Sequence, residues 1–223
     1  MLKLEKNSKI LVLAAHPDDE TLGCGGTIKH LSDKGYNVEL LTFTDGVGSR
    51  NKKDKNRNEK LDEVSKILGI SKYKYGKFWD NALDSVPLLQ LCKFIEKNTK
   101  GPYDIIFTHF IGDLNIDHQL VTKAALTAFR PQYGHKTKIY SYYVPSSTDY
   151  NPLSTFDGNS YFELSEDDVK AKIKALAIYN KEMRKNPHSR SYENVLNLIK
   201  VWGNEVGLDK AEKFKLIREI IWL

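Results

Sequence analysis

An apolar run that ends in four ionisable side chains most constrains the fold of this chain. Residues 10–15 read Ile-Leu-Val-Leu-Ala-Ala, and the ionisable residues that follow at once are His16, Asp18, Asp19 and Glu20. A short continuous aliphatic run is typical of a parallel strand that is buried on both faces. Carboxylates this close together raise one another's pKa values unless a positive charge lies among them. A divalent cation supplies such a charge, and histidine and carboxylate side chains are common ligands of zinc and iron. The run therefore predicts a buried strand that leads into a metal site.

Further strand-like segments alternate with helical ones along the 223 residues. The predicted strands cover residues 10–15, 38–44, 77–79, 104–108 and 138–144, and the predicted helices cover residues 27–34, 58–68, 86–98, 118–129, 166–185 and 192–202. This alternation predicts an α/β fold with a Rossmann-like, doubly wound and mostly parallel sheet that carries helices on both faces. No repeat or linker divides the sequence, so we expect a single domain over residues 1–223.

A second loop rich in histidine and aspartate follows the fourth predicted strand and ends at His118. In the common doubly wound order the first strand lies beside the fourth, and ligands bind between their carboxyl ends. We therefore expect His16 and Asp19 to meet His118. Two histidines and one carboxylate leave positions open for water and substrate, as a catalytic zinc ion requires, and zinc lowers the pKa of a bound water to about 7. Asp18 is the predicted general base. The alternative is that both histidines only hydrogen-bond the loop backbone.

Composition argues against several other classes of protein. The net charge is +5, and much of the basic excess lies in residues 50–57, which include no aromatic residue. Such a run predicts a solvated loop rather than a nucleic-acid surface, and it also suits an anionic substrate.

The apolar runs of the sequence are too short to span a membrane, and residues 1–6 lack the apolar core of a signal peptide. Cys24 and Cys92 lie far apart, which favours a reducing, cytoplasmic location.

The glycine-rich segment at residues 23–26 raises the alternative of a dinucleotide site. It precedes a predicted helix, and Asp45 lies about twenty residues further on, as in the Rossmann pattern. However, Ile28 stands where the third glycine is expected, and seven residues separate the first strand from the glycines. A pyrophosphate there would also face the carboxylates of residues 18–20. We therefore favour the metal site; a nucleotide-binding protein would keep its affinity for the cofactor after chelation.

Three blocks of the sequence, residues 15–27, 45–50 and 113–118, form a specific pattern, and weaker likeness extends through residues 80–84, 144–147 and 182–191. On these blocks the chain resembles the PIG-L/LmbE-like family of metal-dependent sugar N-deacetylases, and most closely its bacterial members associated with surface-polysaccharide sugars. The resemblance implies a Rossmann-like fold, Zn²⁺ held by His16, Asp19 and His118, and Asp18 as the base. Another divalent metal such as Fe²⁺ is the alternative cofactor.

One residue of the third block departs from the family pattern. Many members carry a second histidine three residues before the distal ligand, where this chain has Asn115. An amide can donate a hydrogen bond to a developing oxyanion, but it cannot take up a proton and pass it on at neutral pH. We therefore predict that Asn115 orients or stabilises the substrate, and that Asp18 or another histidine protonates the leaving amine. Asp117 is predicted either to orient a metal-site histidine or to cap the helix that begins at His118.

Five residues outside the metal loops are candidates for contacts with substrate. They are Asp45, Arg50, Asp84, His188 and Arg190. Asp45 and Gly46 also fit a simple turn, and the last two residues lie in a proline-containing break between predicted helices, where binding residues are frequent.

Together these features predict a zinc-dependent N-deacetylase that removes an acetyl group from an amino sugar or sugar conjugate in polysaccharide or glycoconjugate biosynthesis. The substrate is free, nucleotide-linked or lipid-linked, and the sequence leaves these three open. Two alternatives are a hydrolase of another short acyl group, such as formyl, and a non-catalytic metal- or sugar-binding protein. We expect no nucleic-acid partner and no transmembrane segment. The apolar residues 220–223 either close the core or bury against a second subunit, which would make a homo-oligomer.

Overall fold

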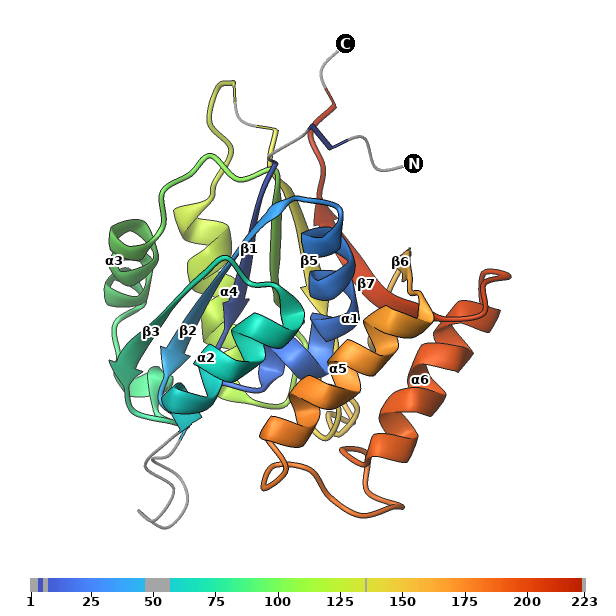
Figure 1. Ribbon diagram of the computed structural model, residues 1–223. Helices are drawn as coiled ribbons and strands as arrows, with labels where there is room; N and C mark the ends of the chain where they lie inside the picture. Colours follow the sequence, from blue (N-terminus) through green and yellow to red (C-terminus); the bar gives the residue numbers. More distant parts are fainter. Residues whose placement is uncertain (1–3, 6–7, 47–56, 135, 222–223) are drawn as a thin grey trace.

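The computed structural model describes residues 4–5, 8–46, 57–134 and 136–221, and Figure 1 shows a single sheet with helices on both sides. The strands are β1 (Lys9–Ala14), β2 (Asn37–Thr44), β3 (Lys72–Phe78), β4 (Ile105–His109), β5 (Lys138–Tyr142), β6 (Ser160–Glu163) and β7 (Ala211–Arg218). The helices are α1 (Asp19–Asp33), α2 (Arg57–Leu68), α3 (Leu88–Asn98), α4 (Ile116–Ala128), α5 (Glu166–Ile178) and α6 (Tyr192–Asn204), with the short 3₁₀ helix η1 (Leu83–Ser85) before α3.

The strand order is β3-β2-β1-β4-β5-β7-β6. Strands β1 to β5 pair in parallel, and β7 runs antiparallel to both β5 and β6. The predicted doubly wound, mostly parallel sheet is therefore confirmed, and β1 does lie beside β4. The carboxyl ends of these two central strands open at the same edge of the sheet, where such folds bind ligands.

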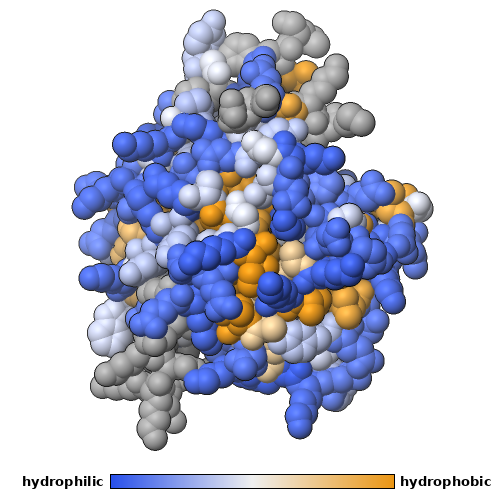
Figure 2. Space-filling view, in the orientation of Figure 1, coloured by the Kyte–Doolittle hydropathy of each residue, from blue (hydrophilic) through white to orange (hydrophobic). Residues whose placement is uncertain are grey.

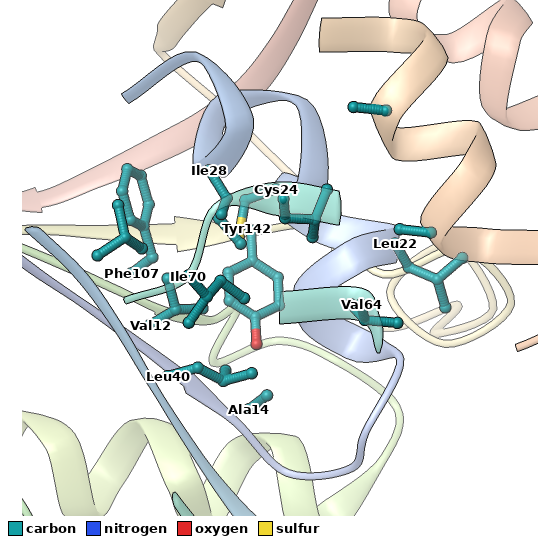
Figure 3. Packing of buried hydrophobic residues seen from close by; sticks show 14 of the residues in the cluster. Val12, Ala14, Leu22, Cys24, Ile28, Leu40, Val64, Ile70, Phe107 and Tyr142 are labelled. Atoms are coloured by element: carbon teal, nitrogen blue, oxygen red, sulfur yellow. The ribbon is translucent and has the colours of Figure 1, made fainter. Parts of the chain in front are cut away.

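Side chains of β1 alternate between two apolar layers, which explains why the whole strand is apolar. Ile10, Val12 and Ala14 belong to the layer that packs under α1, α2 and α5, whereas Leu11 and Leu13 belong to the layer under α3 and α4. Figure 3 shows the first layer, in which strand residues such as Val12 meet side chains of the covering helices. In Figure 2 the outer face over this layer is mostly hydrophilic, with apolar residues gathered between α2 and α5.

Helix α1 begins at Asp19, eight residues before the start that the sequence predicts at residue 27. Its backbone is non-helical at Cys24 (φ −144°, ψ 23°), so two helical pieces meet there at a kink. Gly23 allows this close approach, because a Cβ added to it would lie 2.2 Å from the Tyr142 ring. The glycines therefore serve the packing of α1 against the sheet, and the early start of the helix brings Asp19 into its first turn.

Buried side chains also occupy the amides that the dinucleotide alternative would use. The carboxylate of Glu212 accepts hydrogen bonds from the backbone N–H groups of Gly26 (3.1 Å) and Thr27 (2.7 Å). Lys172 neutralises this carboxylate, since its Nζ lies 2.5 Å from Glu212 Oε1. The carboxylate of Glu212 therefore occupies the place at these amides where the pyrophosphate of a dinucleotide would bind.

The antiparallel strands β6 and β7 are absent from the sequence prediction. Lysine, arginine and glutamate are interspersed with apolar residues in β7, so no continuous apolar run marks this strand in the sequence. Helix α5 also ends at Ile178 rather than at residue 185. At the carboxyl end, Ile221 is 75% exposed and so does not close the core, while residues 222–223 lie outside the described part. Within the described residues, no helix has the length and apolar character needed to cross a membrane.

Candidate metal centre and active site

A cavity of about 460 Å³ opens at the carboxyl ends of the central strands. Its walls come from the β1–α1 loop, the loop after β3, the β4–α4 loop, the turn after β5 and the α5–α6 connection. Several residues predicted to be functional line it: His16, Asp18, Asp19, Asn115, His118, His188 and Arg190. Segments that are distant in sequence therefore meet at the edge of the sheet where the topology predicts a site.

Three of these side chains, His16, Asp19 and His118, each direct one potential ligand atom toward the same position. Asp19 Oδ2 lies 3.1 Å from His16 Nδ1 and 3.3 Å from His118 Nε2, and the two nitrogens are 3.3 Å apart. A tetrahedral zinc ion with bonds of about 2.0–2.1 Å separates its ligands by about 3.3–3.4 Å. The three atoms therefore have the spacing that one such ion requires.

Outer carboxylates hold the two imidazole rings by their other nitrogens. His118 Nδ1 lies 3.2 Å from Asp113 Oδ1, and His16 Nε2 lies 3.0 Å from Asp80 Oδ1 and 3.2 Å from Asp117 Oδ2. A carboxylate behind a ligating histidine fixes the tautomer and the ring orientation, and it strengthens the ring as a ligand. This arrangement leaves His16 Nδ1 and His118 Nε2 as the nitrogens that face a metal ion.

Asp117 also anchors the neighbouring loop, because its carboxylate accepts the backbone N–H groups of Asn81 (2.8 Å) and Leu83 (3.0 Å). His16, Asp80 and Asp117 form a second group with potential metal-binding atoms. Since Asp117 is already engaged by two amides and a ring nitrogen, we assign this second group to holding His16.

The buried charges of the centre stabilise one another. Burial disfavours the charged form of His118, but the carboxylates of Asp19 and Asp113 outweigh this and raise its pKa to about 9. Burial likewise opposes the charge on His16, yet Asp19 above all raises its pKa well above the ordinary value. The reverse holds for Asp19, whose pKa lies well below its usual range because the two rings overcome its desolvation. Without a metal ion the rings hold protons where a cation would bind.

His109, the last residue of β4, contacts the metal centre through His118. Its ring stacks on His118 at 3.9 Å between centroids, with 19° between the planes. His109 Nε2 accepts the backbone N–H of Ala15 (2.8 Å), and Tyr142 Oη lies 3.1 Å from the same nitrogen. Burial lowers the pKa of His109 well below 6.5, so the neutral ring of this last residue of β4 packs against His118.

Asp18 adopts a backbone conformation that side chains rarely take, with φ 129°. Its amide is held by Glu20 Oε2 (3.0 Å), and Arg190 Nη1 donates to Asp18 Oδ2 (3.1 Å). Burial raises the pKa of the neighbouring Glu20 carboxyl to about 7.

The other non-glycine residues described with positive φ, Asn81 (54°) and Ser146 (65°), also line the cavity, as Asp18 does. Concentration of such conformations at one place is characteristic of functional sites.

The remaining predicted residues differ in where they lie. Arg190 reaches the cavity but contacts Asp18 and Ser146 Oγ (3.1 Å). Asp45 is half-buried and precedes Gly46, which lines the cavity, whereas Asp84 is exposed and lies outside the lining. Arg50 lies outside the described residues. The structure thus brings Arg190 to the centre and leaves Asp84 apart from it.

The start of α4 decides between the two alternatives for Asp117. The helix begins at Ile116, and the N-cap is Asn115, whose side chain accepts from the backbone N–H of Asp117 at 2.8 Å. The prediction that Asp117 caps a helix starting at His118 is therefore wrong, since its carboxylate points to His16 instead.

Sequence reasoning missed the roles of Asp80 and Asp113. Asp80 follows the end of β3 and Asp113 follows the end of β4, so the signal that marks both is a carboxylate just after the carboxyl end of a parallel strand. Asp113 is fully buried and also accepts hydrogen bonds from Ser147 and from Thr148 Oγ1 (2.6 Å). Glu182 and Arg184 line the cavity as well, although the sequence analysis assigned them no role.

Comparison with known proteins identifies the family and the fold of the chain. Residues 11–129 match the protein family described as PIG-L, GlcNAc-PI de-N-acetylase. The chain is 31% identical over 150 residues to the uncharacterized deacetylase YaiS of Escherichia coli (strain K12), covering 64% of this chain and 77% of YaiS. The fold matches the conserved protein TT1542 of Thermus thermophilus with a TM-score of 0.75 and 22% identity over 96% of both chains. It also matches the N,N'-diacetylchitobiose deacetylase of Pyrococcus horikoshii, with a TM-score of 0.73 and 21% identity over 94% of this chain and 84% of that one.

The family match spans more than half of the chain and contains both loops of the candidate centre, from the β1–α1 loop to His118. The resemblance carried by the three sequence blocks is thereby confirmed: the chain belongs to the PIG-L family of de-N-acetylases.

Proposed function

We propose that this protein is a metal-dependent hydrolase that removes the N-acetyl group from an amino sugar or a sugar conjugate. The observation that carries the proposal is the triangle of His16, Asp19 and His118 at the base of a cavity that Asp18 also lines. A merely structural metal site needs a closed ligand shell, whereas here the three ligands face a cavity. The donor set suits Zn²⁺, and Fe²⁺ is the alternative.

When bound, the metal would polarise the amide carbonyl and make water a stronger nucleophile. Asp18 takes a proton from the water as the water oxygen bonds to the acetyl carbon. The C–N bond then breaks, and Asp18 returns the proton to the amine nitrogen, which yields acetate and the amino sugar. Arg190 holds the Asp18 carboxylate toward the cavity through its 3.1 Å contact. Asp113 and Asp117 keep the two ligand rings in place.

Acetate release tests the proposal directly. The protein is loaded with zinc and incubated with N-acetyl amino sugars, their nucleotide conjugates and lipid-linked forms, with N-formyl analogues in parallel. We expect acetate from at least one member and its loss after chelation. Release of formate alone would select the other short acyl group. Stoichiometric metal binding without any acyl release would favour a non-catalytic metal- or sugar-binding protein and overturn the proposal.

Metal binding should release protons and strengthen with pH. The pKa of His118 in the metal-free protein is about 9, so its ring is charged at pH 7 and must lose a proton to bind a cation. Since this pKa lies above the unfolded value of about 6.5, the stability that the charged ring gives the metal-free fold is fully present below pH 6.5 and is lost as the pH rises through 9. We therefore expect zinc affinity to increase from pH 6 to 9.

Titration calorimetry in buffers with different ionisation enthalpies measures the released protons. His118→Ala should abolish stoichiometric binding, whereas His30→Ala should not, because His30 pairs with Asp168 away from the cavity. An affinity that is the same at pH 6 and pH 9 would contradict this prediction.

A further inference from the structure

The side chain of Asn115 is already engaged at both ends. Its Oδ1 accepts from the backbone N–H of Asp117 (2.8 Å) as the cap of α4, and its Nδ2 donates to Asn81 Oδ1 (3.1 Å). A side chain used in this way holds two loops together. The Nδ2 group has two hydrogens and the bond to Asn81 takes one of them, so Asn115 offers a substrate at most one donor, and any second donor comes from another residue of the cavity.

His188 is the candidate. Among the described residues, three imidazoles line the cavity, and His16 and His118 are the proposed ligands. His188 enters from the α5–α6 connection, on a different side of the site from the metal loops. It therefore faces the substrate space without belonging to the metal shell.

One hydrogen bond fixes which nitrogen of His188 carries a proton. The backbone N–H of Arg190 donates to His188 Nδ1 at 3.0 Å. A backbone N–H can only donate, so Nδ1 must accept and has no proton of its own. The neutral ring then carries its proton on Nε2. A proton on Nδ1 would point at the N–H of Arg190, so this hydrogen bond forms only while Nδ1 is unprotonated.

The segment around His188 is fixed on both sides. His188 N–H donates to Lys185 O (3.1 Å), and His188 O accepts from Ser191 N–H (2.9 Å). Ser189 Oγ accepts the backbone N–H of Ser146 (3.0 Å) and donates to Asp149. These bonds fix the backbone of the segment, and the Arg190 N–H fixes the ring, so the donor is in position before substrate arrives, as a donor for a transition state should be.

We propose that His188 donates its Nε2–H to the acetyl carbonyl oxygen of the substrate and never gives up that proton. The inference rests on the proposed deacetylase function. As water adds to the carbonyl carbon, the oxygen gains negative charge and the hydrogen bond from His188 strengthens. When the C–N bond breaks, the amine nitrogen takes its proton from Asp18. His188 is thus a neutral donor to the carbonyl oxygen, the stabilising role that the sequence predicted for Asn115.

Glutamine distinguishes a donor from an acid, because it can donate a hydrogen bond but cannot carry a proton. His188→Ala should lower kcat by roughly 10²–10³-fold, the scale of one lost oxyanion donor, while KM changes by less than about threefold. His188→Gln should recover at least about tenfold of that loss and leave the pH profile of kcat unchanged. His30→Gln serves as the control, since His30 lies outside the cavity lining.

Nitrogen-15 NMR of histidine-labelled, metal-free protein at pH 8 gives a readout that needs neither metal nor substrate. We expect the His188 signals of an unprotonated Nδ1 and a protonated Nε2, with the assignment made by their loss in His188→Ala. A proton on Nδ1 would overturn the inference. So would an alanine variant that keeps kcat, one that raises KM alone, as a sugar contact would, or a glutamine variant as slow as alanine. If the wild type releases no acyl group, the proposed function fails while the NMR result still stands on its own.

Discussion

Replacing Asp18 by asparagine is expected to lower kcat for acyl release by roughly 10²–10⁴-fold, the contribution of a positioned acid–base group. Asparagine has nearly the same shape as aspartate, so the substitution adds no new steric demand on the backbone at φ 129°. Its amide, however, accepts no proton from water. Since Asp18 provides none of the three ligand atoms, the bound metal should remain.

Metal content and kcat must therefore be measured on the same preparation. Asp167→Asn is the matched control, because Asp167 is an exposed carboxylate on α5, and this variant should keep full activity. A kcat within about threefold of wild type, far less than a positioned acid–base group contributes, would remove Asp18 from the proposed chemistry. Loss of the metal ion from Asp18→Asn would instead show that the residue acts through the centre and not as the base.

The largest effect on stability is expected from Glu212→Ala. Glu212 and Lys172 are both buried, with 2.5 Å between Oε1 and Nζ, and Lys172 Nζ also donates to Leu22 O (2.8 Å). Removing the carboxylate leaves a buried ammonium group without its counter-charge and frees the amides of Gly26 and Thr27. Breaking a buried pair in this way costs about 3–5 kcal/mol of unfolding free energy, which urea denaturation measures.

An exposed pair provides the comparison. Lys66 Nζ and Asp62 Oδ2 are also 2.5 Å apart, but both side chains are mostly exposed, so Asp62→Ala should change stability little. The double variant Lys172→Met with Glu212→Gln should lose less than Glu212→Ala, because it leaves no unpaired buried charge. Equal losses from Glu212→Ala and Asp62→Ala would mean that the buried pair does not hold α1 to β7.

The sequence alone determined the centre of the fold and the members of the candidate ligand triangle. The continuous apolar run of β1 is stable only in a sheet that is covered on both faces. The alternation of strands and helices leaves few ways to order the strands in such a sheet. In those topologies β1 lies beside β4, so a histidine and three carboxylates that follow one strand lie next to the loop that follows the other. Local pattern and a general topological rule were therefore sufficient to bring His16, Asp19 and His118 together.

Only the tertiary structure decided what surrounds that triangle. His16 and Asp117 are 101 residues apart, and Gly26 and Glu212 are 186 apart. No local pattern records which distant carboxylate faces a given ring or amide, because that choice depends on how loops from several strands converge. The same reason explains β7, whose charged residues resemble a surface segment until Glu212 is seen buried at the amides of α1. The residues proposed to perform chemistry were marked by their local sequence, whereas the partners that hold them were selected by packing across the whole sheet.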